Sequence, residues 1–203
     1  MKNLYKRAIR LELFTIGYNV LEAVASILFG VLASSIALVG FGLDSVVESL
    51  SGLILLWRLS LYGKGREEEE EKREQKAIKF VAVTFFVLAA YIVYESLEKL
   101  LAGEMPSPSI PGMIIAVLSL IIMPVLAYYK YKTGKLINSK ALIADSKETL
   151  VCALLSLTLF IGLGANYLFG FWQADPVAGL IIAAFLIHEG KEVWEEAGEE
   201  DDD

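Results

Sequence analysis

Long apolar stretches recur along the chain and are separated by short polar connections. A helix needs about 20 apolar residues to cross a hydrocarbon core about 30 Å thick, and six stretches reach that length. The pattern therefore predicts an all-α polytopic membrane protein, with a single six-helix transmembrane domain over residues 1–198 and an acidic tail over 199–203. The expected spans are residues 10–32, 35–57, 77–101, 111–131, 140–164 and 174–194.

Composition agrees with the pattern and narrows the function classes. Hydrophobic residues make up 56% of the chain and the mean hydropathy is +0.56, which is too apolar for an ordinary soluble domain. The net charge of -7 comes largely from two acidic runs, at residues 67–71 and 199–203, and argues against nucleic-acid binding. Cys152 is the only cysteine, so no disulfide can form within the chain.

Lysine and arginine mark alternate connections. They crowd the N-terminus, the stretch 58–79, and the group Lys130, Lys132, Lys135 and Lys140, whereas the three other connections carry none. Because cytoplasmic loops carry the excess of positive charge, both termini are expected to be cytoplasmic, in a multi-pass protein of the cell membrane.

Four carboxylates lie inside the expected spans: Asp44 and Glu48 in the second, Asp145 and Glu148 in the fifth. Each ionised carboxylate at the centre of a membrane helix costs roughly 2.5–3.5 kcal/mol on insertion scales. Such residues are usually functional, and these four predict a route for ions.

Depth along the helices groups four of the polar side chains. Counted at about 1.5 Å per residue from the nearest flanking cations, Glu48 lies about 15 Å and Asp44 about 21 Å deep, and Glu148 about 12 Å and Cys152 about 18 Å deep. Within each helix the two members are spaced i, i+4, so they share a face. We therefore predict a metal site formed by Asp44, Glu48, Glu148 and Cys152.

Other polar residues are predicted to have accessory roles at this site. Asn19 and Glu22 share one face of the first span at comparable depth, and Ser45 adjoins Asp44. Asp145 counts to only about 8 Å from the cytoplasmic edge, so it is expected at the entrance or as a partner of Lys147.

The types of ligand bear on the metal. Mixed oxygen and sulfur ligands suit zinc, or cadmium, cobalt or iron(II), whereas carboxylates with Asn19 alone would favour manganese or magnesium. Metal is expected as the transported substrate, with no prosthetic group. Ligands must lose protons to bind metal, which is a physical basis for metal/proton exchange. The only histidine, His188, is expected to face the surface rather than to bind metal.

Three segments resemble signatures of one known family. They run from Ser35 to Glu48 (SIALVGFGLDSVVE), over residues 141–145 (ALIAD) and over residues 174–180 (ADPVAGL). In these segments the chain resembles the cation diffusion facilitator (cation efflux) family, in which two ligand pairs on helices two and five bind the metal. The resemblance places Asp44 and Glu48 on one pair, and Glu148 and Cys152 on the other.

The resemblance also implies a mechanism and an assembly. It implies proton-coupled efflux of a divalent metal by alternating access, and a homodimer. The chain departs from the family pattern at Glu48, Glu148 and Cys152, where Asp, His or Asp, and Asp are usual, so typical metal preferences do not transfer. The C-terminal cytoplasmic domain of typical members is expected to be missing, which would leave any dimer to membrane helices.

Two alternatives from other classes remain open at this point. One is an intramembrane aspartyl protease using Asp44 and Asp145, although its Gly-x-Gly-Asp motif does not match and the two aspartates differ in depth by more than about 10 Å. The other is a membrane metal sensor or scaffold that binds metal without transporting it. Proteoliposome flux separates the sensor from a transporter.

Overall fold

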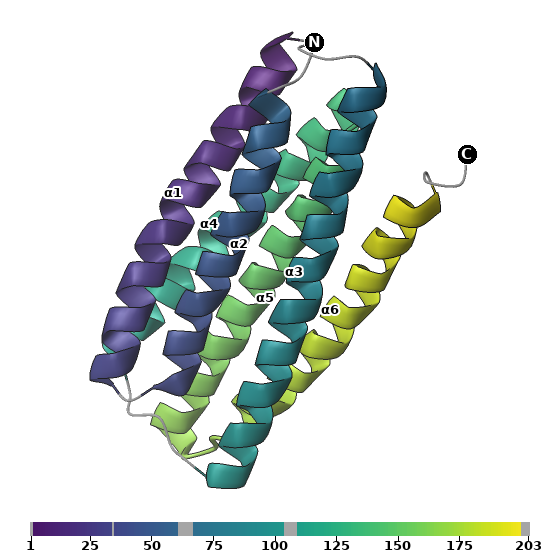
Figure 1. The fold of residues 1–203 in the computed structure, drawn as a ribbon. Helices are drawn as coiled ribbons and strands as arrows, with labels where there is room; N and C mark the ends of the chain where they lie inside the picture. Colours follow the sequence, from purple (N-terminus) through teal and green to yellow (C-terminus); the bar gives the residue numbers. More distant parts are fainter. Residues whose placement is uncertain (1, 34, 61–66, 104–108, 200–203) are drawn as a thin grey trace.

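The structure is a computed structural model that describes residues 2–33, 35–60, 67–103 and 109–199. Within these ranges it consists of six helices joined by short connections (Figure 1). The connections around Ser34 and Pro106 and the acidic tail from residue 200 lie outside the described residues. The helices are α1 (Lys2–Leu32), α2 (Ile36–Ser60), α3 (Glu67–Ala102), α4 (Ile110–Ile137), α5 (Lys140–Phe169) and α6 (Ala174–Glu199).

Consecutive helices run in opposite directions, so the start of α1 and the end of α6 lie at the same end of the bundle (Figure 1). The most extensive packing joins α1 with α2, α4 with α5, and α3 with α6. Contacts of α2 with α5, and of α1 with α4, tie these pairs together. This arrangement fits the expectation that both termini lie on one side of the membrane.

Five of the six expected spans meet the length and composition needed to cross a membrane, which makes this a multi-pass membrane protein. Over its described residues α6 does not join them, so the sixth span stays a prediction. The five candidate spans are Asn3–Leu32, Ala37–Ser60, Gln75–Ala102, Ile110–Ile137 and Lys140–Ala165.

The helices are longer than the expected spans. α1 begins at Lys2, and α4 continues to Ile137, where Asn138 ends it in the left-handed conformation (φ 53°). Asn tolerates this conformation better than most residues, and here it closes the helix with a backbone bond to Gly134. The expected spans are shorter than the helices because they include mainly the apolar residues, whereas charged turns at the membrane edges remain helical in the structure.

Polarity along α1 is inverted relative to a soluble helix. Its polar residues at positions 12, 15, 19, 22 and 26 follow the spacing of one helix face, and all are at most 3% exposed. The opposite face presents large apolar side chains, among them Leu21 (73% exposed) and Val24 (64%). Apolar groups outside and polar groups inside are what a hydrocarbon solvent favours.

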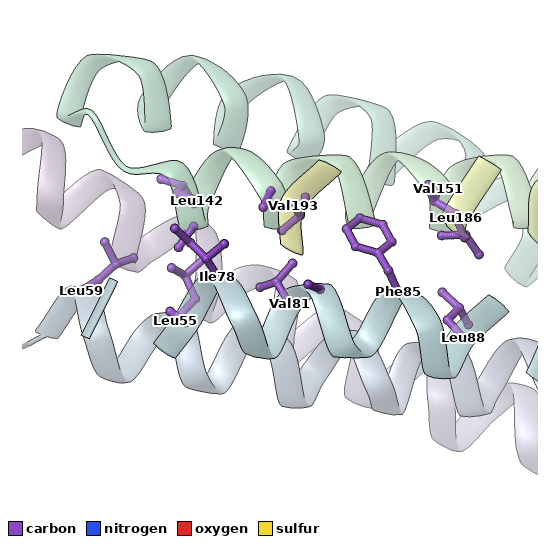
Figure 2. Packing of buried hydrophobic residues seen from close by; sticks show 14 of the residues in the cluster. Leu55, Leu59, Ile78, Val81, Phe85, Leu88, Leu142, Val151, Leu186 and Val193 are labelled. Atoms are coloured by element: carbon purple, nitrogen blue, oxygen red, sulfur yellow. The ribbon is translucent and has the colours of Figure 1, made fainter. Parts of the chain in front are cut away.

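One large hydrophobic cluster joins α2, α3, α5 and α6, with Tyr5 and Ala8 of α1 at its edge. Figure 2 shows Phe85 projecting from α3 into this cluster, and the side chain is fully buried. A second cluster joins α2, α4 and α5 and includes Cys152. The clusters fix α5 at the centre of the bundle, where polar side chains from its neighbours meet.

Close backbone contact fixes α1 against α2. A Cβ atom at Gly30 would lie 2.7 Å from the backbone nitrogen of Val39, and one at Gly42 would lie 3.0 Å from the carbonyl oxygen of Ala23. Small residues permit such approach in membrane helix packing. The two helices are therefore held at a distance that brings their polar faces together.

Candidate metal centre

The four predicted metal ligands are all buried inside the bundle. Asp44, Glu48, Glu148 and Cys152 are 3%, 1%, 2% and 1% exposed. α2 supplies the first two and α5 the last two, and these helices are in contact. The expectation that polar residues of α2 and α5 lie at matching levels is confirmed by a direct bond, because Thr149 Oγ1 donates to Glu48 Oε1 at 2.7 Å.

Asp44, Glu48 and Cys152 form the closer part of the group. The Cys152 side chain lies beside both carboxyl groups, near enough to interact with each. The i, i+4 spacing of Asp44 and Glu48 puts both on the face of α2 that meets α5. Cys152 of α5 therefore lies near each of two carboxyl groups of α2, although these three side chains do not form a group that could hold a metal ion.

Glu148 is buried on α5 without a hydrogen bond to either of its carboxyl oxygens among the described residues. Ser51 of α2 and Thr84 of α3 are among the polar groups near it, together with Glu48 and Asp145. Among the described residues, no three Asp, Glu, His or Cys side chains stand close enough together to hold a metal ion. The four-ligand site thus remains a prediction, and this conformation does not assemble it.

Several acceptors at this level lack donors. Asp44 Oδ2, Glu48 Oε2 and both oxygens of Glu148 are buried without a hydrogen-bond partner among the described residues. Burying a carboxylate oxygen unpaired costs about 1–3 kcal/mol or more. A cation or a proton at these oxygens would remove that cost.

The accessory candidates on α1 differ from one another. Glu22 is bound by two hydroxyls: Ser45 Oγ donates to its Oε2 at 2.9 Å, and Tyr18 donates to its Oε1 at 3.3 Å. Tyr18 also pairs with Ser119 of α4 at 2.7 Å. Asn19 is fully buried, and within the described chain neither atom of its amide has a partner. Glu22 and Ser45 therefore support each other beside Asp44, whereas Asn19 is left able to bind a ligand.

A buried ion-pair network adjoins the site. Lys130 Nζ donates to Asp145 Oδ2 at 2.5 Å and lies 3.3 Å from Glu12 Oε2, and all three side chains are fully buried. Lys130 also donates to Thr149 at 3.1 Å, and Thr149 in turn bonds Glu48. We call Glu12, Lys130, Asp145 and Thr149 the lysine network.

The lysine network corrects two expectations. Lys130 is not a loop cation, because α4 extends beyond it and carboxylates of α1 and α5 compensate its charge inside the bundle. Asp145 pairs with Lys130 rather than Lys147, since residues two apart on a helix do not face each other. Lys147 instead lies 3.7 Å from Glu192 of α6, and the buried Asp145 is not exposed at an entrance.

His188 is confirmed at the surface. Its side chain is 69% exposed and lies 3.5 Å from Glu192 one turn along α6. Sequence reasoning missed Glu12 and Thr149 as parts of the polar core. The signal available for Glu12 was its place on the polar face that also carries Asn19 and Glu22.

Comparison with known proteins gives one family match. The model for the cation efflux transmembrane domain matches residues 13–199. The chain is 27% identical to transmembrane protein 163 of Xenopus laevis over 93% of this chain and 66% of that protein. It is 26% identical to an uncharacterized transporter of Methanocaldococcus jannaschii, and 26% identical to the manganese efflux system protein MneP of Bacillus subtilis. Each of these two alignments covers 83% of this chain and 60% of the relative, so the chain spans about two thirds or less of the relatives' length.

Proposed function

This chain belongs to the cation efflux transmembrane domain family, and on that premise we propose that it carries divalent metal cations across a membrane. Members of the family are transporters and not enzymes. The aspartyl protease alternative is therefore wrong. In addition, Asp145, one of its two proposed catalytic aspartates, forms an ion pair with Lys130.

One observation supports the assignment of the transport site to α2 and α5. Oxygens of Asp44, Glu48 and Glu148 are buried without donors among the described residues, and Cys152 lies near the first two of these carboxyl groups. Buried charge in a membrane protein needs compensation, and a transported cation supplies it. We assign Asp44, Glu48, Cys152 and Glu148 as ligands of the transported metal, with Glu22 and Ser45 orienting Asp44 and with Asn19 as a further oxygen donor.

The chemistry of the ligands favours zinc as substrate. A thiolate selects zinc or cadmium over manganese, and three carboxylates accept any of them. Cobalt and iron(II) are intermediate cases. One relative is named as a manganese efflux protein, which keeps manganese in the test.

Transport requires the ligands to assemble and separate. The four proposed ligands do not form a metal-binding group in this conformation, so we propose that a shift of α5 against α2 and α3 brings Glu148 and Cys152 together with Asp44 and Glu48. Because metal and protons compete for the same carboxyl and thiol groups, we propose that export of metal is coupled to entry of protons. In alternating access, the site would then hold metal when it opens to one side of the membrane and protons when it opens to the other.

We further propose that the protein works as a homodimer in the cell membrane, with its termini cytoplasmic. The positive residues of the N-terminus and of the stretch 58–79 support that orientation. Crosslinking in native membranes, compared with the mass of the chain in detergent, tests the dimer.

Flux into proteoliposomes tests the function. Wild type and the single variants Asp44→Ala, Glu48→Ala, Glu148→Ala and Cys152→Ala are compared for uptake of zinc, cadmium, cobalt, iron(II) and manganese. We expect the two α2 variants to abolish uptake, while Glu192→Ala, which removes an exposed carboxylate, leaves it unchanged.

Each outcome has a defined meaning. Normal transport by both Asp44→Ala and Glu48→Ala would show that the site is wrong. Metal binding without flux in wild type would favour the sensor or scaffold. Flux that persists when the pH gradient is collapsed would remove the proton coupling but keep the transporter.

A further inference from the structure

A cavity opens beside Asp44 on the side away from the lysine network. It has a volume of about 60 Å³ and lies between α2, α3 and α5. One water needs roughly 10–15 Å³ of such space, so the cavity has room for a few waters or a partly hydrated ion. Its polar lining comes from Asp44, Tyr91, Glu95, Lys99 and Thr158.

Two carboxyl groups share this cavity. Asp44 is 3% exposed, and its Oδ2 has no hydrogen-bond partner among the described residues. Glu95 is 9% exposed and comes from α3 to the same cavity, with the Tyr91 hydroxyl beside it.

Gly40 makes the meeting of these groups possible. A Cβ atom at this position would overlap the Tyr91 hydroxyl and the Glu95 carboxylate. Gly40 precedes Asp44 by one helical turn, so the Glu95 carboxylate lies about 6 Å along α2 from the level of Asp44. A single cation with its water ligands can bridge two carboxylates whose levels differ by about this much.

We propose that this cavity is a second cation site, in which Asp44 and Glu95 bind a hard divalent cation such as Mn²⁺ through carboxylate oxygens and water. The lining groups that can bind a metal are all oxygen, since the Lys99 ammonium group is itself a cation, and oxygen ligands suit manganese or magnesium and not a thiolate-seeking metal. The site lies towards the end of the bundle away from the chain termini. A role for it on the transport route rests on the proposed function, whereas its ability to bind a cation does not depend on that function.

Lys99 gives the site an internal competitor. It lines the cavity one turn beyond Glu95, on the same face of α3, and it is 7% exposed. An ammonium group near the Glu95 carboxylate opposes a bound cation and favours its release. Removal of this charge should therefore tighten binding, which is the opposite of what removal of a carboxylate should do.

Binding of Mn²⁺ to the purified full chain in detergent tests the site directly, with free Mn²⁺ measured by electron paramagnetic resonance. We expect Glu95→Gln to weaken Mn²⁺ binding at least tenfold and Lys99→Gln to tighten it. Gly40→Ala should also weaken binding, because the methyl group would push the Tyr91 hydroxyl and the Glu95 carboxylate out of their positions. Gly164→Ala is the matched control, since a Cβ atom there meets nothing within 4 Å.

The outcomes separate this site from the proposed function. Unchanged Mn²⁺ affinity in Glu95→Gln would overturn the site, whether or not the wild type transports metal. Weaker binding in Glu95→Gln together with absent flux in wild type would keep the site and overturn the transporter. Glu95→Gln preserves the size of the side chain, so a variant with wild-type thermal stability excludes misfolding as the cause; if Gly40→Ala fails to fold, the Glu95→Gln and Lys99→Gln pair decides alone.

Discussion

Replacement of Lys130 by methionine should destabilise the protein more than any other single change in the polar core. The side chain keeps most of its length but loses its charge, and two buried carboxylates, Glu12 and Asp145, then remain without compensation. At an effective dielectric constant of about 20, unit charges 3.3 and 2.5 Å apart attract by about 5 and 7 kcal/mol. Desolvation of the ammonium group opposes most of this gain.

Measured losses for one partner of a buried ion pair lie at about 3–5 kcal/mol, and we expect Lys130→Met to fall in that range. The assay is reversible unfolding in mixed micelles, followed by circular dichroism against the mole fraction of dodecyl sulfate. Lys132→Met is the matched control, because Lys132 is exposed on the same helix and only approaches the Tyr128 ring, at 5.9 Å. The control should lose less than about 1 kcal/mol.

A combined variant distinguishes an uncompensated charge from lost packing. Replacement of a whole buried ion group by neutral residues of similar size is often neutral or stabilising. Glu12→Gln with Lys130→Met and Asp145→Asn should therefore recover most of the stability that Lys130→Met loses. A loss for Lys130→Met no greater than that for Lys132→Met, or no recovery in the combined variant, would refute the electrostatic account of the lysine network.

Three further predictions concern the site and the packing. Thr149→Val removes a donor to a site carboxylate and should weaken zinc binding by about 10–100-fold in calorimetry, whereas Thr149→Ser should restore it; an affinity within threefold of wild type would contradict this. Cys152→Ser should weaken zinc and cadmium flux more than manganese flux, and equal effects on all three metals would remove the thiol from the ligand set. Gly30→Ala should cost about 1–3 kcal/mol in the micelle unfolding assay, because the methyl group meets backbone, whereas Gly17→Ala meets nothing within 4 Å and should stabilise by up to about 1 kcal/mol; equal midpoints would contradict the packing argument.

Periodicity and depth were sufficient to predict the helices and the convergence of α2 with α5. The i, i+4 spacing fixes which residues share a face, and counting from flanking cations fixes their level. Cys152 of α5 lies near Asp44 and near Glu48 of α2 for these reasons, whereas the four-ligand site itself stays a prediction. These features depend on single helices and on their direction, both of which are local properties of the sequence.

Lys130 and Glu148 could not be placed in this way. A lysine near the end of a span satisfies the rule for flanking cations equally well whether it faces water or turns inward, and only the positions of Glu12 and Asp145 decide between them. The surroundings of Glu148 depend on how α5 packs against α2 and α3, which no spacing within α5 determines. The cavity at Gly40 likewise arises from side chains of another helix.

The polar face of α1 sets a condition on biogenesis. When α1 emerges from the ribosome it carries Glu12 and Glu22 toward a bilayer in which each ionised carboxylate costs roughly 2.5–3.5 kcal/mol at the helix centre. The ammonium group that compensates Glu12 is made only with α4, three helices later. α1 therefore gains its stable position in the membrane late, when α4 and α5 deliver Lys130 and Asp145 to it, and chains truncated after α3 should leave α1 exposed to proteolysis.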